Sequence, residues 1–225
     1  MGLLSLFQDN PAIFFVVVVV LFLSLALHEW GHAISALWMG DRTAQMQGRV
    51  TLNPLKHLDI LGAAMLLLVG FGWAKPVPVY PPNFRNYRVG LFVVSIAGIV
   101  INLILAVAFG LLLRYLYLQD PRGVVEAINS GSLDAAGFWA VVAFYVATVN
   151  LALAFFNLLP IPPLDGSKIL QAFLPLSWHP YIWRLEANPT YAVVALLLFF
   201  TVLREPVQQF LGLVRGQFFN ILGLS

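Results

Sequence analysis

Two histidines and a glutamate stand together in the run His28-Glu29-Trp30-Gly31-His32. Residues four apart lie on one face of a helix, so both imidazoles can bind a single zinc ion. Glu29 follows the first histidine and can accept a proton from water that the metal activates. A coincidental pair of histidines in a helix of a soluble protein is the alternative. It fits poorly with the apolar sequence around the motif, because unpaired polar groups in lipid are costly.

Asp165 is the candidate for a third metal ligand. A catalytic zinc ion usually has three protein ligands and one open position. Most of the ten acidic residues stand in polar, loop-like sequence, whereas Asp165 follows a long apolar run and a proline-rich stretch. Aspartate is also favoured as the N-cap of a helix, here one over residues 166–173. From the residues alone, ligand and cap are equally supported.

Three apolar segments are long enough to place these residues inside a membrane. Residues 11–27 are apolar apart from Ser24, and the helical pattern continues to about Met39. As a helix, this segment covers about 25 Å, and a hydrocarbon core is about 30 Å thick. The motif at His28 and His32 therefore lies at membrane depth. The other two segments are residues 89–118 and 133–156, so we expect an all-α polytopic membrane protein with a three-span catalytic core.

The regions between and after the spans have a different character. Residues 40–88 contain turn formers, a strand-like piece at 48–52 and an apolar stretch at 60–73. The apolar stretch is too short for a comfortable span and predicts a re-entrant or half-buried helix. Residues 75–79 alternate with prolines and should be extended, which completes a re-entrant and β-hairpin region. Residues 119–134 are expected to form a polar loop. Residues 191–203 are marginal as a span, and the tail at 207–224 is expected at the membrane interface.

These segments predict one membrane-embedded domain over residues 1–225. Its core covers about residues 11–175, with the region 40–88 facing the cytosol and accessory helices at 189–225. Hydrophobic residues make up 60% of the chain and charged residues 10%, against about 25% charged in a soluble domain. The first apolar segment has no basic residues before it and no typical cleavage site after it, so we expect it to be retained and not removed as a signal peptide.

Charge and cysteine content exclude several classes of partner and chemistry. The net charge of +2 comes without a basic stripe, which gives no support for a nucleic-acid partner. Cysteine is absent, which excludes disulfides and thiol catalysis. Residues 40–88 carry six basic and two acidic residues, and the loop 119–134 carries one basic and three acidic. The positive-inside rule then places 40–88 in the cytosol. Both ligand-bearing stretches approach that side, and we expect the protein in the cell membrane.

The two motifs together closely resemble the site-2 protease family of intramembrane zinc metalloproteases. The run Asn157-Leu-Leu-Pro-Ile-Pro-Pro-Leu-Asp165-Gly166 looks like that family's Asn-x-x-Pro-x-Pro-x-x-Asp-Gly signature, residue for residue. Residues 48–57 and 70–79 look like the compact subgroup that lacks PDZ and CBS domains. The resemblance covers about residues 13–175.

The resemblance implies roles for individual residues. Asp165 would be the third ligand of one zinc ion per chain. Asn157 would stabilise the oxyanion or hold substrate, although from the sequence it could also cap the end of its helix. The segment 70–79 would pair with an unwound substrate by strand addition. The chain has Ile99 where the family commonly has a proline, which puts a kink there in doubt, while Asn102 keeps its place.

The expected function is hydrolysis of peptide bonds in transmembrane or membrane-associated proteins, with the lipid bilayer as surroundings. A metal transporter or channel is one alternative. It predicts polar residues spread along several spans, whereas here they cluster at one depth, Arg114 excepted. A catalytically inactive membrane scaffold is the other alternative, and the presence of Glu29 argues against it. His57 and His179 stand in proline-flanked stretches and are expected to face solvent or the membrane interface.

Overall fold

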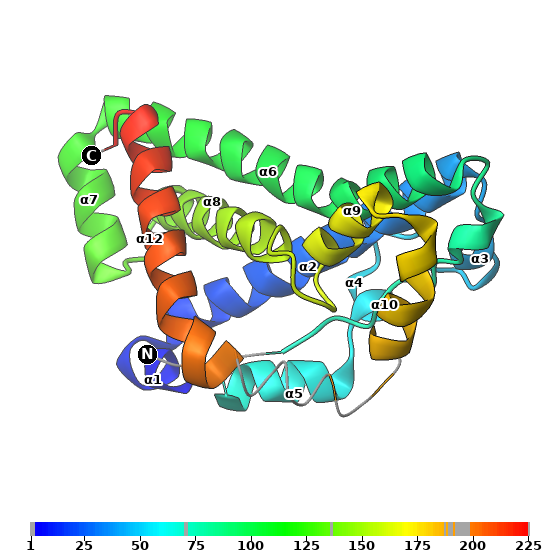
Figure 1. Cartoon of the computed structure of the whole chain (residues 1–225). Coiled ribbons are helices and arrows are strands. Elements are labelled where there is room, and N and C mark those ends of the chain that lie inside the picture. The colour runs from blue at the N-terminus through cyan, green and yellow to red at the C-terminus, as the bar shows by residue number, and fades with distance from the viewer. Residues whose placement is uncertain are drawn as a thin grey trace.

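Three long helices form the centre of the molecule. The structure is a computed structural model, and it describes residues 3–69, 72–135, 137–186, 188, 191 and 199–224. Helices α2 (Pro11–Met39), α6 (Tyr87–Gln119) and α8 (Phe138–Asn157) pack against one another, as Figure 1 shows. Each is long and apolar enough to cross a membrane. Only 33–39% of the residues in its most apolar 18-residue stretch are buried within the molecule. Most of this apolar surface therefore faces outward, as in a protein surrounded by lipid, and the three predicted span segments are confirmed as candidate membrane-spanning helices.

The ends of these helices follow from local sequence. Helix α2 begins after Asn10, whose side chain accepts a hydrogen bond from the Ile13 amide (3.1 Å), and Pro11 fills its first turn. It ends at Gly40, whose φ of 108° is a backbone conformation that residues other than glycine rarely adopt. Helix α6 begins after Asn86, which accepts from the Val89 amide in the same way (3.1 Å). Helix α6 runs on through Ile99 to Gln119 as one continuous element.

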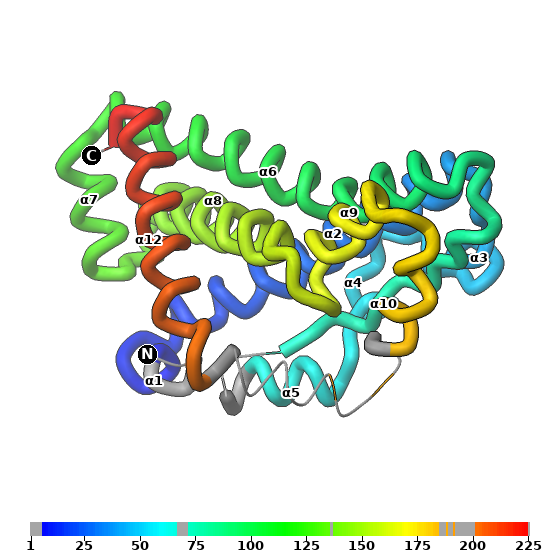
Figure 2. Tube along the Cα trace, in the orientation of Figure 1, coloured from blue at the N-terminus to red at the C-terminus, as the bar shows by residue number. Residues whose placement is uncertain are grey.

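Shorter elements surround the three spans, and Figure 2 traces their order along the chain. They are α1 (Leu3–Asp9), α3 (Thr43–Met46), α4 (Pro54–His57), α5 (Ile60–Val69), the 3-10 turns Pro81–Asn83 and Leu176–Trp178, α7 (Pro121–Ser130), α9 (Asp165–Phe173), α10 (His179–Glu186), the π-helical turn Phe199–Leu203 and α12 (Arg204–Ile221). Helix α12 lies against α8 in both views. The mostly helical architecture is thus the expected one.

Three details differ from the sequence-based expectation. The predicted loop at 119–134 contains α7, which has Asp120 as N-cap, proline in its first turn and Gly131 in the left-handed region at its end. Residues 48–52 form turns and bends, and the described residues contain no β-strand, only an isolated antiparallel bridge between Leu58 and Ala74. The third span begins at Phe138, not at residue 133. Of the segment 191–203, residues 192–198 lie outside the described residues.

Arg114, the ionisable residue within the second span, has a structural role. Its Nη1 donates to the carbonyl of Leu222, at the C-terminal end of α12 (2.5 Å). Carbonyls at the end of a helix lack intrahelical donors, so this contact ties α12 to α6 and pairs the guanidinium at the same time.

Helices α2 and α6 approach closely because glycines stand on both. A Cβ atom on Gly31 would lie 2.6 Å from Cδ1 of Ile101, and one on Gly98 would lie 2.5 Å from Cε1 of His28. Small residues of this kind are typical of helix contacts within membranes. Gly98 therefore leaves the space that the His28 ring occupies.

Asp41 joins the end of α2 to the segment that leads into α6. Its side chain is fully buried, and it accepts hydrogen bonds from the amide and hydroxyl of Thr43, the Tyr80 amide (2.7 Å) and the Asn83 amide group (2.9 Å). Burial alone would raise the pKa of Asp41, but the hydrogen bonds from Asn83, Thr43 and Tyr80 together hold it below its usual value. The ionised form is thus the one that the fold requires.

Replacing Gly98 with Ala should destabilise the protein by about 1–3 kcal/mol, the usual cost of an overpacked interior. The measurement is the unfolding midpoint in mixed detergent micelles. Gly216→Ala in α12 is the control, because a Cβ atom there meets no heavy atom within 4 Å, and helix propensity alone favours that change. Equal midpoints for the two variants would show that the contact with His28 is not tight.

Asp41→Asn should lower the free energy of unfolding at pH 7 by about 1–3 kcal/mol, because an amide group then faces donors that need an acceptor. Since the pKa of Asp41 is lower in the folded state than the unfolded value near 4, this stabilisation is present above that value and is lost as pH falls through the folded pKa. The difference between wild type and variant should therefore shrink in acid. Asp134→Asn, at an exposed carboxylate with one amide donor, is the control; a pH-independent difference would contradict the account.

Candidate metal centre

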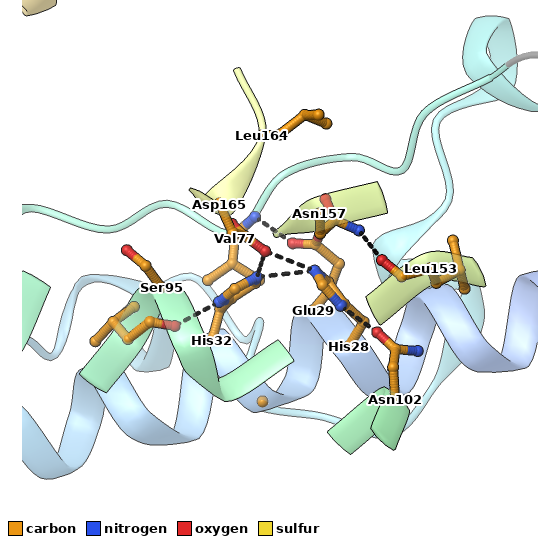
Figure 3. Close-up of polar contacts among 12 residues, drawn as sticks. His28, Glu29, His32, Val77, Ser95, Asn102, Leu153, Asn157, Leu164 and Asp165 are labelled. Carbon is orange, nitrogen blue, oxygen red and sulfur yellow. Dashed lines mark hydrogen bonds and ion pairs between the residues drawn. The ribbon is translucent and has the colours of Figure 1, made fainter. Parts of the chain in front are cut away.

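Three side chains from two distant parts of the chain converge at one point. His28 and His32 stand one turn apart on α2, and their Nε2 atoms are 3.0 Å from each other. Oδ2 of Asp165 lies 3.1 Å from the first and 3.2 Å from the second, as Figure 3 shows. All three residues are buried, with exposed fractions of 4%, 8% and 8%. The structure thus brings together the three residues that the sequence singled out as metal ligands.

Asp165 is not the N-cap of α9. It is the first residue of that helix, and Leu164 occupies the cap position without a side-chain hydrogen bond. The carboxylate of Asp165 points to the two imidazoles instead. Gly166 makes this placement possible, since a Cβ atom there would lie 2.2 Å from the carbonyl oxygen of Leu158. The chain after α8 can therefore fold back against the end of that helix and present Asp165 to α2.

Both imidazoles are oriented by a partner on Nδ1. His32 Nδ1 lies 2.7 Å from the carbonyl oxygen of Val94 on α6. His28 Nδ1 lies 2.5 Å from Oδ1 of Asn102, which stands eight residues after Val94 on α6. An oxygen acceptor at Nδ1 holds the proton there and leaves the lone pair on Nε2 for a metal ion. In both histidines, Nε2 is the atom that faces Asp165.

The arrangement fits a zinc ion. Zinc binds nitrogen and oxygen at about 2.0–2.2 Å in tetrahedral geometry, which separates two ligand atoms by about 3.3–3.5 Å. The observed separations of 3.0–3.2 Å are within a few tenths of an ångström of that figure. Asp165 Oδ2 is buried and finds no hydrogen-bond donor in the described part of the chain. Two nitrogen lone pairs and an oxygen that meet in an apolar interior need a cation between them.

Glu29 stands beside the cluster, and the extended segment after α5 holds its side chain. Its Oε2 accepts a hydrogen bond from the Val77 amide (2.9 Å). Pro76 and Pro78 flank Val77 and have no N–H group. The segment therefore offers a single amide donor at this point, and it is directed at Glu29.

Asn157 is the last residue of α8. Its Nδ2 donates to the carbonyl oxygen of Leu153 in the same helix (3.0 Å). The Leu153 carbonyl is not one of the last four of α8, so this bond does not cap the end of the helix. The side chain lines the same cavity as the metal cluster.

A cavity of about 830 Å³ opens onto the cluster. Its wall includes Glu29 and all three candidate ligands, and the rest is largely apolar. Pro76, Val77 and Val79 of the extended segment form one side. The volume lies in the upper part of the range for ligand pockets, about 300–1,000 Å³, which suits a short stretch of polypeptide.

The expectation for His57 and His179 was wrong, since both are buried with 2% exposure. Nε2 of His57 lies 2.8 Å from the Thr51 carbonyl oxygen, and Nδ1 of His179 lies 2.8 Å from the Tyr87 hydroxyl. Neither belongs to the metal cluster. Prolines near both histidines suggested exposed loops, but these stretches pack onto the molecule as short helices.

Sequence reasoning missed Asn150, which contacts Asn102 in the interior of the three spans. The available signal was a polar side chain within an apolar span, which by default marks a functional position. What the sequence could not give was its partner, because this depends on how each span is rotated about its axis.

Comparisons with known proteins agree on one family. Residues 114–200 match the model of "Peptidase family M50". The "Putative zinc metalloprotease YwhC" of Bacillus subtilis (strain 168) is 40% identical over 188 residues, which are 83% of this chain and 80% of the relative. The "Putative zinc metalloprotease Rip2" of Mycolicibacterium smegmatis is 33% identical over 167 residues, 72% of this chain and 58% of the relative.

A more distant relative is the "Putative zinc metalloprotease MJ0611" of Methanocaldococcus jannaschii, 29% identical over 144 residues, which are 62% of this chain and 61% of the relative. The chain therefore spans somewhat more than half the length of the last two relatives. No solved structure matches the chain. On the strength of the family match and the long alignment with the Bacillus protein, this chain belongs to peptidase family M50, the site-2 protease family of zinc metallopeptidases.

Proposed function

We propose that this chain is an intramembrane zinc metalloendopeptidase that cuts transmembrane or membrane-associated proteins. The proposal rests on one observation. Ligand atoms of His28, His32 and Asp165 meet beside α2, which is long and apolar enough to span a membrane, and all three residues line a largely apolar cavity large enough for a peptide. Polar groups at such depth are costly and are tolerated where they line a functional cavity. Residues 1–225 would form a single membrane-embedded domain around this site, with the core at 11–175.

His28, His32 and Asp165 would hold one zinc ion. A bound zinc ion supplies Lewis acidity, which polarises a peptide carbonyl and lowers the pKa of a coordinated water molecule. The protein's own contribution is to fix the donor atoms: α6 orients both imidazoles through Val94 and Asn102, and the turn at Gly166 delivers the carboxylate. Three protein ligands leave a fourth position for substrate chemistry.

Glu29 would act as general base and then as general acid. Its carboxylate would take a proton from the attacking water and pass it to the amine of the leaving fragment. The hydrogen bond from the Val77 amide holds one carboxylate oxygen and leaves the other free for the proton. The base is thus held by the same segment that lines the cavity.

Asn157 would donate to the oxygen of the reacting carbonyl. Its amide has two N–H groups, and the bond to Leu153 uses one of them. The second can stabilise negative charge that develops on the substrate. The position of Asn157 on the cavity wall supports this role.

The substrate would bind as an extended strand. A transmembrane helix hides its carbonyls in its own hydrogen bonds, so it must unwind before hydrolysis. The segment from Pro76 to Val79 lines the cavity and would pair with the unwound stretch by strand addition. Since the Val77 amide is bonded to Glu29 and the two prolines have no N–H group, the pairing would use the carbonyl oxygens of the segment and the Val79 amide. We further propose that the region 40–88, re-entrant in part, opens the site to the cytosol at the cell membrane, on the basis of its excess of basic residues.

A transporter or an inactive scaffold fits the site less well. A transport path needs polar groups along its whole length, whereas the three candidate ligands meet at a single point. Membership of a peptidase family and the placement of Glu29 beside the ligands both favour hydrolysis.

Glu29→Gln should bind zinc as wild type does and lose cleavage activity by about 100-fold or more, the range for a general acid–base group. Glutamine keeps an oxygen acceptor for the Val77 amide, so the fold at this point is preserved. Activity is measured on a library of single-span polypeptides in proteoliposomes, with products identified by mass spectrometry. Glu126→Gln, on the exposed face of α7, is the control. Full turnover by Glu29→Gln, or no cleavage of any library member by zinc-loaded wild type, would refute the proposal.

His28→Ala, His32→Ala and Asp165→Ala should each abolish stoichiometric zinc binding, because a site with two ligands left is a weak one. Zinc content is measured after equilibration with a chelator. His179→Gln is the control, since it changes a buried histidine outside the cluster. Zinc retained at one ion per chain in all three alanine variants would place the metal elsewhere. A zinc flux across liposomes in place of cleavage would favour the transporter.

A further inference from the structure

A chain of buried polar side chains crosses the apolar interior of the three spans. Ser24 stands on α2, Asn102 on α6 and Asn150 on α8, with exposed fractions of 3%, 0% and 0%. Ser24 contacts Asn150, Asn150 contacts Asn102, and Asn102 contacts His28. Buried side-chain amides in lipid are costly unless they are paired. The presence of Asn102 and Asn150 in this interior therefore needs a physical reason.

The hydrogen bonds in this chain have defined directions. Nδ2 of Asn150 donates to the Ser24 hydroxyl (2.8 Å) and to the Val146 carbonyl oxygen (2.9 Å). Oδ1 of Asn150 accepts from Nδ2 of Asn102 (2.7 Å). Oδ1 of Asn102 then faces Nδ1 of His28 at 2.5 Å.

The Val146 carbonyl sets this order, because a carbonyl can only accept. It requires the Nδ2 group of Asn150 on its side, and the oxygen of Asn150 must then face Asn102. Asn102 must therefore donate from its own Nδ2 group to the oxygen of Asn150, and its oxygen then faces His28. An oxygen opposite Nδ1 holds the proton there. If Asn102 were flipped, its N–H group would face Nδ1 and the proton of the neutral ring would lie on Nε2, which would then have no lone pair for a metal ion in the cluster.

The tautomer of His32 does not depend on the orientation of a side-chain amide. Its Nδ1 faces the Val94 carbonyl oxygen directly, and a backbone carbonyl cannot be flipped. The two histidines thus differ in how their tautomers are fixed: one by the backbone, the other by an amide that has two possible orientations.

We propose that Asn150 is a positioning residue that selects the metal-binding tautomer of His28 by fixing the orientation of Asn102. This role rests on the metal centre proposed above, since it concerns the affinity of that centre for zinc. Among the described residues, the side chain of Asn150 forms hydrogen bonds with Asn102, Ser24 and Val146 and with none of the three candidate ligands, and Asn150 does not line the cavity. It acts only through Asn102.

Replacing Asn150 with Leu removes the acceptor and keeps a similar volume. Zinc affinity, measured by chelator competition on the full chain in detergent, should fall about 10–100-fold, as for other residues that orient metal-bound histidines. Thr148→Val is the matched control: it removes from the same helix a buried hydroxyl that has no hydrogen-bond partner among the described residues, and it should leave affinity unchanged. Unchanged affinity in Asn150→Leu, while wild type binds zinc, would refute this role and leave the proposed function intact. Failure of wild type to bind zinc would refute both.

Replacing Asn102 with Asp separates tautomer selection from a simple loss of packing. A carboxylate can only accept, so it fixes Nδ1–H on His28 without help from Asn150. In the wild-type background it faces the oxygen of Asn150 and should weaken zinc binding. In the Asn150→Leu background it should instead strengthen zinc binding. If Asn102→Asp weakens binding in both backgrounds, Asn150 only supports the packing and the proposal fails.

Discussion

The structure depends on bringing three acceptor atoms together in an apolar interior. Nε2 of His28, Nε2 of His32 and Oδ2 of Asp165 lie within 3.2 Å of one another, an arrangement that repels itself unless a cation lies between the atoms. Much of the architecture around the cluster serves this contact. Helix α6 supplies the partners for both Nδ1 atoms, Gly98 leaves space for one ring, and Gly166 allows the chain to turn back so that Asp165 reaches α2.

The apolar interior of the three long helices makes this constraint strict. Polar groups in such an interior are costly unless they pair within the protein, and several of them do. Asn102 and Asn150 pair with each other, Glu29 pairs with the Val77 amide, and Arg114 pairs with the Leu222 carbonyl. The same rule explains why the substrate would need the extended segment: an unwound helix in lipid needs new backbone partners.

Much of this could be predicted from sequence, for identifiable reasons. Long apolar runs give the three spans, and the four-residue spacing of His28 and His32 places both on one helix face. Partners across helices could not be predicted, because they depend on the rotation of each span; Asn150 and the burial of His57 are examples. Helix α7 could have been found, since Asp120, Pro121 and Gly131 are typical start and stop signals. From the residues alone, Asp165 was ambiguous between cap and ligand; the resemblance to the family favoured the ligand, and the fold places its carboxylate against both imidazoles.

The account is tested most directly by X-ray absorption at the zinc edge on purified wild-type protein. It predicts one zinc ion per chain with nitrogen and oxygen neighbours at about 2.0–2.2 Å, including the outer-shell scattering of two imidazole rings. The imidazole signal should drop to one ring in His28→Ala if any zinc remains. A first shell of six oxygens without imidazole, or wild-type protein that binds no zinc at all, would contradict the central claim.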